Sequence, residues 1–390
     1  MRRSSSDVVV VGAGVVGVSC AHYLARRGAR VTLLDSRPPL SYTSSLSTEC
    51  YRNYWSNHGP MTAFMNRSID LLEARAAECG NAFSMNRRGY CFLSRTAEGA
   101  ARHAAAAGAI GGLVHADGAH GIAYRGAALP YDAIVDDLTV FQGAESIRSF
   151  FGNGGLPDFV SPDIVSLLHC GRCGWMNAQQ MGTQLLEMAK AEGARTIVPA
   201  TLLGITTTDD GRISGVSAAT ADDPNLHVPC GAVVNAAGPY AHHVNQLLGG
   251  GASLPPLENE IHAKAMLSDV EGAVPSDAPM MIYEDNVTLP WSEEEAEALE
   301  GMGGFEASLI RPLAGGAHFR PYPGHTNTLL MLWEAIHADI AVTEPPPSEP
   351  ELRGTLFAEL MLRGLTEMVP NLGEKYLRED GSMGARVTID

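Results

Sequence analysis

The sequence predicts an α/β protein made of two structural units. Three observations lead to this prediction: a β-branched run that enters a glycine-rich turn near the N-terminus, a second buried strand that ends in small residues near position 235, and a change to short strands after Leu257. A chain of 390 residues is long enough to bury two separate cores. Strands that alternate with amphipathic helices favour a parallel sheet in the first unit, and short strands separated by turns favour an antiparallel sheet in the second.

The first unit begins at the strand Asp7–Val11, which has the β-branched composition of a strand buried on both faces. Positions 12–17 have the sequence Gly-Ala-Gly-Val-Val-Gly and lead into an amphipathic helix that ends at Gly28. A second strand, Arg30–Asp35, finishes on an acid. This order of strand, glycine turn, helix, strand and acid is typical of a dinucleotide-binding unit.

The glycines of this turn have separate roles in such a unit. Gly12 permits the tight turn, Gly14 lets the backbone approach a pyrophosphate, and Gly17 lets helix and strand pack closely. The helix N-terminus offers N–H groups and a positive dipole end to phosphates. Asp35 stands where a carboxylate accepts hydrogen bonds from a ribose diol. We therefore expect a dinucleotide site, with a glycine-rich turn that holds no ligand as the alternative.

The composition argues against several classes of partner. A net charge of −17 argues against nucleic acid and anionic membrane surfaces, and no window approaches the length of a transmembrane helix. Only six residues precede the first strand, too few for a signal or transit peptide. Seven cysteines, an odd number, indicate reduced intracellular thiols, and Cys170 and Cys173 are expected to be ordinary thiols rather than metal ligands. We expect a cytoplasmic protein without a metal site; a mitochondrial location is the alternative.

A hydroxyl-rich segment, Ser41–Thr48, follows the second strand. Its hydroxyl and N–H groups either close over the phosphates or form a plain polar loop. Aromatic and charged residues then concentrate at 49–55. Beyond them a methionine and aromatic stripe recurs at helical spacing and is expected to be core: Met61, Phe64, Met65, Ile69 and Leu72.

The middle of the chain contains further recognisable elements. We expect a strand at 88–93, a helix at 97–107, an irregular insertion at 108–130 and an amphipathic helix at 177–192. Two strand-like runs flank Asp209-Asp210-Gly211 and predict a hairpin. A buried strand at 232–235 ends in Ala236-Ala237-Gly238, whose small side chains let the chain run close beneath a cofactor, and the helix 241–248 follows.

The second unit is expected to supply a wall of short strands over a pocket. The predicted strands are Glu260–Leu267, Met280–Tyr283, Ala307–Pro312, His318–Arg320 and Thr328–Trp333. Three prolines at 345–347 predict a rigid linker, and an amphipathic helix is expected at 349–368.

These motifs together resemble a known family. The glycine turn with Asp35, the hairpin, Val233–Pro239, the pair Gly174-Trp175 and the run Phe319-Arg320-Pro321 resemble the FAD-dependent amino-acid and amine oxidoreductases. This family includes D-amino-acid oxidase, glycine oxidase, and sarcosine oxidase and dehydrogenase; the nearest group is that of FAD-dependent oxidoreductase domain-containing protein 1. The resemblance covers nearly the whole chain, and the combination of the two glycine-bearing motifs is specific.

The resemblance implies a Rossmann-like FAD-binding domain and a discontinuous, mainly antiparallel-sheet substrate domain of α+β type. Residues 1–60, 174–256 and 345–390 would form the first, and 61–173 with 257–344 the second. The implied FAD-binding residues are Gly12, Ala13, Gly14, Val15, Val16, Gly17, Asp35, Ser36, Arg37, Ser44, Ser45, Leu202, Ala237 and Gly238. The family more often has glutamate where this chain has Asp35.

The implied reaction is hydride transfer from the carbon beside the nitrogen of a small amine or amino acid to the flavin. Arg52 matches an arginine beside the flavin ring, and Arg52 or Arg320 would bind a substrate carboxylate. His318 and Lys264 would influence amine protonation or flavin charge. Where sarcosine oxidases have an oxygen-activating lysine, this chain has Leu330-Met331, so O2 and an electron-transfer protein or quinone are both expected acceptors.

Two rival functions stay open. A flavin-binding assembly factor of respiratory complex I without turnover is implied by the nearest group, and it suits a chain that looks truncated at Asp390, before the family's flavin-covering turn. An NAD-dependent dehydrogenase is disfavoured by the hairpin and the Asn235–Pro239 motif.

Overall fold

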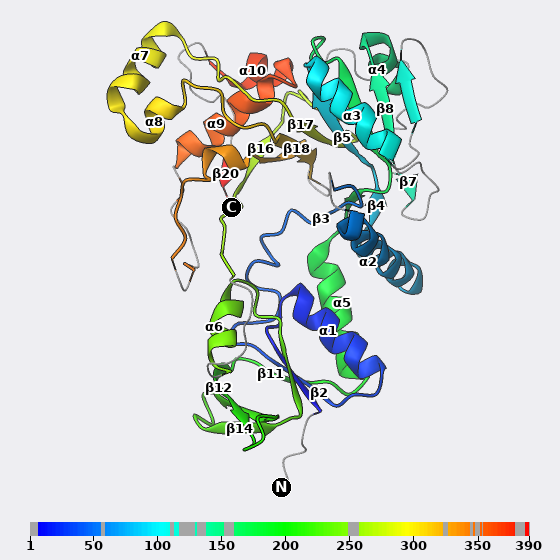
Figure 1. Cartoon of the computed structure of the whole chain (residues 1–390), viewed down its shortest axis with the longest axis vertical. Helices are drawn as coiled ribbons and strands as arrows, with labels where there is room; N and C mark the ends of the chain where they lie inside the picture. Colours follow the sequence, from blue (N-terminus) through cyan, green and yellow to red (C-terminus); the bar gives the residue numbers. More distant parts are fainter. Residues whose placement is uncertain are drawn as a thin grey trace.

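The computed structural model describes residues 7–55, 59–109, 113–116, 129–130, 138–151, 160–248, 257–322, 327–343, 346–347, 352, 354–378 and 387–389. They form two units that lie one above the other along the long axis of Figure 1. The smaller unit contains the N-terminal strand, and the larger contains most of the strands between residues 86 and 389.

A four-stranded parallel sheet forms the centre of the smaller unit. Its strand order is β11 (Arg195–Ile197), β2 (Val31–Leu34), β1 (Val8–Val11) and β15 (Ala232–Asn235). All pairs are parallel, so the strands end at the same edge of the sheet, where open α/β sheets bind ligands. The predicted strands at 7–11, 30–35 and 232–235 are therefore confirmed.

Helices cover one face of this sheet and a second sheet covers the other. Helices α1 (Val15–Arg26) and α5 (Ala178–Ala191) pack over Val10 and Leu33. The predicted hairpin is present as β12 (Thr201–Thr207) and β13 (Ile213–Ala219); with β14 (Leu226–Pro229) it packs over the opposite face. The one-turn helix η1 (Gly238–Tyr240) and α6 (Ala241–Gln246) follow β15.

A nine-stranded sheet forms the larger unit. It is mixed but mainly antiparallel; the pairs β17–β5 and β6–β8 are parallel. The strand order is β20 (Val387–Ile389), β16 (Lys264–Ser268), β19 (Thr328–Leu332), β18 (Ala317–Pro321), β17 (Met280–Tyr283), β5 (Tyr90–Ser94), β9 (Ser166–Cys170), β8 (Leu138–Gln142) and β6 (Leu113–Ala116).

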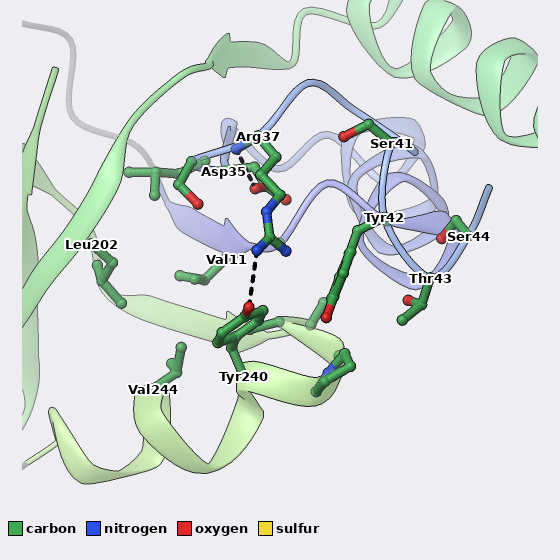
Figure 2. A pocket seen from close by; sticks show the side chains of 18 of the residues that line it. Val11, Asp35, Arg37, Ser41, Tyr42, Thr43, Ser44, Leu202, Tyr240 and Val244 are labelled. Carbon is green, nitrogen blue, oxygen red and sulfur yellow. Dashed lines mark hydrogen bonds between the residues drawn. The ribbon is translucent and has the colours of Figure 1, made fainter. Parts of the chain in front are cut away.

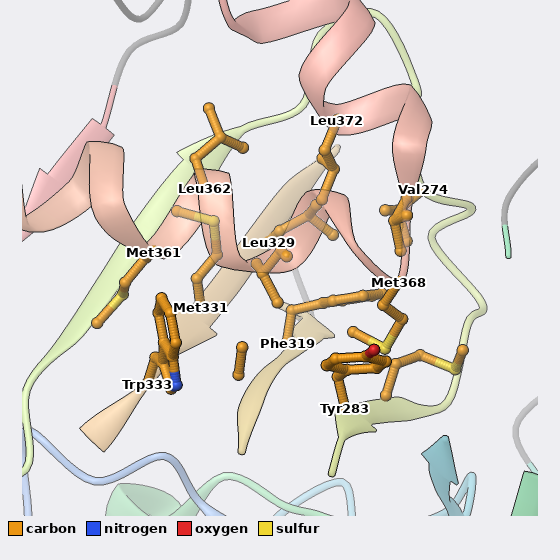
Figure 3. Packing of buried hydrophobic residues seen from close by; sticks show 14 of the residues in the cluster. Val274, Tyr283, Phe319, Leu329, Met331, Trp333, Met361, Leu362, Met368 and Leu372 are labelled. Carbon is orange, nitrogen blue, oxygen red and sulfur yellow. The ribbon is translucent and has the colours of Figure 1, made fainter. Parts of the chain in front are cut away.

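The two faces of this sheet have different surroundings. Helices α4 (Ala144–Phe151), α9 (Thr355–Thr366) and α10 (Pro370–Tyr376) cover one face, where Phe319 and Met331 pack against Met368 (Figure 3). The opposite face carries Lys264, His318 and Arg320, and we call it the inner face. Lys264 lies opposite Leu332, and Leu332 lies opposite His318, so these side chains project from the same side. Helix α3 (Ala97–Ala109) packs over the outer end of the inner face, where His103 bonds to Ser166.

Short elements connect the two units. Strand β3 (Cys50–Tyr51) pairs with β10 (Gly174–Trp175), and α2 (Gly59–Glu78) leads from the first segment into the larger unit. β4 (Asn86–Arg87) pairs with β7 (Leu129–Pro130). In Figure 1, α2 lies beside the upper end of α5, at the level where the units meet.

Several sequence-based expectations for the larger unit were wrong. The expected strand Ala307–Pro312 is instead the end of helix α8 (Gly304–Ser308), which follows α7 (Glu293–Met302), and a turn. Glycines 303 and 304 both have positive φ, and the chain re-enters a helix there because alanine and glutamate disfavour strands. The first expected strand starts only at Lys264, and the described part of the last helix starts at Thr355.

Two further differences concern packing. Met61 and Phe64 of the predicted core stripe are 41% and 66% exposed, whereas Ile69 is buried. The sequence also places residues 345–390 in the FAD-binding domain. In the structure, α9 and α10 pack on the nine-stranded sheet and β20 pairs with β16, so these elements lie with the larger unit. Most of the predicted insertion at 108–130 lies outside the described residues.

Candidate cofactor and substrate site

A cavity of about 250 Å³ opens at the carboxyl edge of the parallel sheet (Figure 2). Its walls come from the glycine turn, the end of β2 with the loop that follows it, the start of β12, and the segment from β15 into α6. The two glycine-bearing motifs, about two hundred residues apart in the chain, therefore face one space. The parallel pairing of β1 and β15 brings them together.

The glycine turn tolerates no side chain at two of its positions. Gly12 has φ +104°, and a Cβ there would lie 2.2 Å from the carbonyl oxygen of Ala236. A Cβ on Gly17 would lie 1.8 Å from the carbonyl oxygen of Gly12. The close helix–strand contact predicted for Gly17 is thus present. Gly14 lines the cavity itself, and its missing Cβ leaves room for a ligand at the helix N-terminus.

The start of α1 is tied to the loop that follows β2. The N–H of Val15 donates to the hydroxyl oxygen of Ser44 at 2.9 Å, and Gly14, the N-cap residue, supplies no side chain of its own. The hydroxyl-rich segment therefore folds back over the helix N-terminus. The sequence left two alternatives for this segment, a plain polar loop and a loop that closes over the phosphates. The contact between Ser44 and Val15 fits the second.

Asp35 holds both neighbouring loops. One carboxylate oxygen accepts the N–H of Ala13 at 2.6 Å, and the other accepts the N–H of Arg37 at 2.8 Å. Each oxygen of an ionised carboxylate has a second lone pair, so both retain the capacity to accept from a ligand hydroxyl. The carboxylate lines the cavity from the end of β2.

Arg37 forms an aromatic stack on one wall, which Figure 2 shows. Its guanidinium lies 4.1 Å from the ring centre of Tyr42 and 5.1 Å from that of Tyr240, and it donates to the Tyr240 hydroxyl at 2.9 Å. The hydroxyls of Tyr240 and Tyr42 donate to the carbonyls of Pro346 and Pro347. The proline-rich segment is thereby held against the cavity.

The cavity collects most of the sequence-predicted cofactor residues. The lining includes Gly12, Gly14, Asp35, Ser36, Arg37, Ser44, Leu202, Ala237 and Gly238. Val15 adjoins it through Ser44, whereas the Val16 side chain is exposed and Ser45 bonds to the carbonyl of Tyr42. Sequence reasoning missed Tyr42, Tyr240, His243 and Val244. The aromatic residues beside the two glycine motifs were the available signal.

Two of the four predicted catalytic residues are committed to backbone contacts. Arg320 is 0% exposed, and its Nε and Nη2 donate to the carbonyl of Thr48 at 3.1 and 2.7 Å. Lys264 donates from Nζ to the carbonyl of Leu46 at 3.1 Å. Both cations therefore hold the segment 46–48 against the inner face. Neither is placed to bind a substrate carboxylate while these bonds are intact.

His318 lies on the same face, two residues before Arg320 on β18 and separated from Lys264 by Leu332. Its Nδ1 lies 2.7 Å from the carbonyl oxygen of Gly316, so Nδ1 carries the proton and Nε2 is the acceptor. Burial lowers the pKa of His318 below its ordinary value, and the charge of Arg52 acts in the same direction. The ring is thus neutral at pH 7.

Arg52 differs from the other predicted catalytic residues. Its guanidinium lies 4.0 Å from the ring centre of Trp55, and no carboxylate of the described chain pairs with it. The neighbouring Tyr54 packs edge-on against Phe92 of the inner face at 5.4 Å, and burial raises its pKa to about 12. Arg52 is therefore a half-buried cation beside neutral and apolar groups.

Among the described residues, no three histidine, cysteine, aspartate or glutamate side chains are grouped to hold a metal ion. No helix in the described ranges is both long enough and apolar enough to cross a membrane.

Comparisons with known proteins agree with this geometry. The family model of the FAD-dependent oxidoreductases matches residues 7–374. The fold is similar to L-proline dehydrogenase from P. horikoshii, with a TM-score of 0.64 and 18% identity over 95% of this chain and 79% of that one. Glycine oxidase from Geobacillus kaustophilus gives 0.60 and 16% identity over 99% and 83%. L-amino acid deaminase from Proteus vulgaris, with its specific insertion sequence deleted, gives 0.62 and 17% over 95% and 76%.

Proposed function

The chain belongs to the family of FAD-dependent oxidoreductases, and from this premise we propose that it oxidises the C–N bond of a small amine or amino acid. FAD is the cofactor of this family. The solved structures of similar fold are an amino-acid dehydrogenase, an oxidase and a deaminase, which supports an amino-acid or amine substrate.

The residues around the cavity fit the adenosine diphosphate part of FAD. Gly12 and Gly14 would leave space for the pyrophosphate at the start of α1, with Val15 and Ser44 beside it. Asp35 would accept from the adenosine ribose. Ser36, Arg37, Leu202, Ala237 and Gly238 also line the cavity, and Ser45, Ala13, Val16 and Gly17 complete the proposed set without lining it.

The single observation that carries the substrate proposal is the state of Arg52. A guanidinium that stacks on Trp55, without an acid in the described chain, is a receptor for a carboxylate. Arg320, by contrast, donates to the carbonyls of Thr48 and Pro321, and its Nη2 lies 3.6 Å from the carboxylate of Glu49. We therefore assign the substrate carboxylate to Arg52, and to Arg320 and Lys264 the task of holding segment 46–48.

Bound FAD supplies the acceptor for a hydride from the carbon beside the nitrogen. The protein's part is to orient the substrate and control its protonation. Neutral His318, with Nε2 free to accept, favours an uncharged amine, which is the form that can lose hydride. The electron acceptor is O2 or an electron-transfer protein or quinone. In the stretch that corresponds to the lysine-bearing strand of sarcosine oxidases, Leu330 and Leu332 face the inner side and Met331 faces the opposite core. None of these three side chains carries a charge.

The test is expression of the protein, measurement of its flavin absorption spectrum, and turnover with sarcosine, glycine, L-proline and D- and L-amino acids. Both O2 and an artificial electron acceptor are supplied. We expect bound FAD and turnover of at least one substrate. The proposed location of the protein is the cytoplasm, with mitochondria as the alternative. A protein that binds FAD but oxidises none of the panel would favour the assembly-factor function. A protein that binds no flavin would overturn the proposal.

A further inference from the structure

A second groove lies between the last turn of α1 and the C-terminal half of α2. Its volume is about 510 Å³, and it shares no lining residue with the cofactor cavity. Sites for small molecules in proteins commonly measure roughly 300–1,000 Å³. The groove therefore has the size of a ligand site.

The charge of this groove is opposite to that of the whole chain. Four arginines and two acids line it: Arg26, Arg27, Arg67, Arg75, Asp70 and Glu78. Both acids are already paired. Asp70 accepts from Arg172, outside the groove, at 2.7 Å, and Glu78 lies 2.8 Å from Arg75 and 3.8 Å from Arg26.

Within the described ranges, two arginines of the groove have no acidic partner, Arg27 and Arg67. The guanidinium of Arg27 donates to the carbonyl of Tyr23 at 3.4 Å. A local surplus of positive charge on a chain of net charge −17 creates a position that attracts anions.

Arg75 forms the floor of the groove. The residue is only 7% exposed, and its Nε has no hydrogen-bond partner among the described residues. Its Nη1 faces the thioether sulfur of Met188, a weak acceptor. Because this Nε is itself shielded from the groove, Arg75 contributes its positive charge to the floor rather than a hydrogen bond to a ligand.

We propose that the groove between α1 and α2 binds a small multivalent oxyanion, with phosphate or carboxylate groups, as a site separate from the cofactor and substrate. Guanidinium groups bind such oxygens bidentately, and Arg27 and Arg67 provide the two unpaired charges that a dianion needs. Tyr23 adds a hydroxyl to the wall.

The position of the groove gives the ligand a mechanical effect. Helix α1 starts at the glycine turn, whereas α2 is joined to the larger unit through the ion pair of Glu73 with Arg87. The two helices already share one core through Val18 and Ala21 of α1 and Ile69 and Ala76 of α2, so an anion bound to both adds a contact between them. By linkage the anion raises the stability of the folded protein by RT ln(1 + L/Kd), where L is the free anion concentration.

The test is isothermal titration of the FAD-loaded protein with pyrophosphate and, separately, with citrate at low salt. Bound FAD keeps pyrophosphate away from the glycine turn. The variant R27A/R67A removes the unpaired cations and leaves buried Arg75 in place. The matched control R212A/R311A removes two exposed arginines elsewhere.

We expect the R27A/R67A affinity for at least one anion to fall by roughly tenfold or more, since two charge-assisted contacts are lost. The control should keep the wild-type affinity within about twofold. Preference between pyrophosphate and citrate identifies the phosphate or the carboxylate as the natural group. Absence of binding in the wild type, or equal loss in both double variants, overturns the site. Amine turnover in the same preparations shows independently whether the proposed reaction holds.

Discussion

The hydroxyl oxygen of Ser44 lies 2.9 Å from the backbone nitrogen of Val15 and accepts its hydrogen bond at the start of α1. A cofactor phosphate bound at this helix N-terminus would use the same N–H. The serine thus satisfies, without cofactor, a donor that the cofactor would satisfy.

This relationship predicts a state-dependent effect of Ser44→Ala. Loss of a capping hydroxyl costs about 1 kcal/mol, so the protein without FAD should be destabilised by that amount. With saturating FAD the loss should be smaller, because the phosphate supplies the acceptor. Urea unfolding with and without FAD measures both values, and Ser68→Ala in α2, whose hydroxyl donates to the carbonyl of Phe64 in the same helix, is the control. Equal losses in the two states would contradict the prediction.

Gly17→Ala should destabilise the protein and abolish FAD retention. The added Cβ would lie 1.8 Å from the carbonyl oxygen of Gly12, so α1 must move away from β1. Such overpacking costs about 1–3 kcal/mol or more. Gly108→Ala in α3 is the matched control, because a Cβ there meets nothing within 4 Å. The control should be neutral or stabilised by about 0.5–1 kcal/mol. Thermal unfolding and flavin absorbance distinguish the two variants.

Asp35→Asn should weaken FAD binding by roughly 10- to 100-fold, equivalent to about 1–3 kcal/mol. The carboxylate accepts from Ala13 and Arg37 through separate oxygens, whereas an amide has one acceptor and places an NH2 against the other donor. Titration of the apoprotein by FAD fluorescence measures the affinity. Asp209→Asn in the exposed hairpin turn should leave it unchanged.

Arg52→Ala should change substrate binding, whereas Arg320→Met should change the stability of the fold. For an amino-acid substrate, Arg52→Ala should raise KM by roughly 10- to 100-fold, since a charge-assisted contact contributes about 1.5–3 kcal/mol, with little change in stability. For an amine without a carboxylate, KM should stay the same. Arg320→Met should instead lower stability by roughly 2–4 kcal/mol, because the carbonyl of Thr48 loses two buried donors. The opposite pattern would show that Arg320, and not Arg52, binds the substrate carboxylate.

Stability should rise with pH between about 4 and 6.5 through His169. Burial lowers its pKa from 6.5 to about 4, so in this window the unfolded chain binds the proton and the folded protein does not. The contribution is complete above pH 6.5, is lost as the pH falls toward 4, and amounts to at most about 3 kcal/mol. Urea unfolding of His169→Gln across pH 4.5–7.5 should show a smaller slope than the wild type. Exposed His227→Gln should show the wild-type slope.

The smaller unit was predictable because its signals are local. The β-branched run, the glycine spacing and the Asp209-Asp210-Gly211 turn each specify their element from neighbouring residues, and β1, α1, β12 and β13 appear where expected. The meeting of the glycine turn with Ala237 and Gly238 follows from the shared carboxyl edge of β1 and β15.

The larger unit depends on pairing between distant segments, which single-sequence patterns do not encode. Nothing near Tyr90–Ser94 indicates that it pairs in parallel with Met280–Tyr283. The roles of Lys264 and Arg320 were missed for the same reason, since their partners Leu46 and Thr48 lie more than two hundred residues earlier. A cation in a strand gives no sign of whether it faces a ligand or a carbonyl.

The parallel sheet also sets the order of events during synthesis. Its strands are synthesised in two groups, β1 and β2 first and β11 and β15 more than 150 residues later, after four of the nine strands of the larger sheet. A nascent chain that has not yet extended past Tyr240 has only part of the wall that would grip a nucleotide. Cofactor binding is thus expected late in synthesis, after β15 has been made. Until then the glycine turn lacks its neighbouring strand and is exposed to solvent.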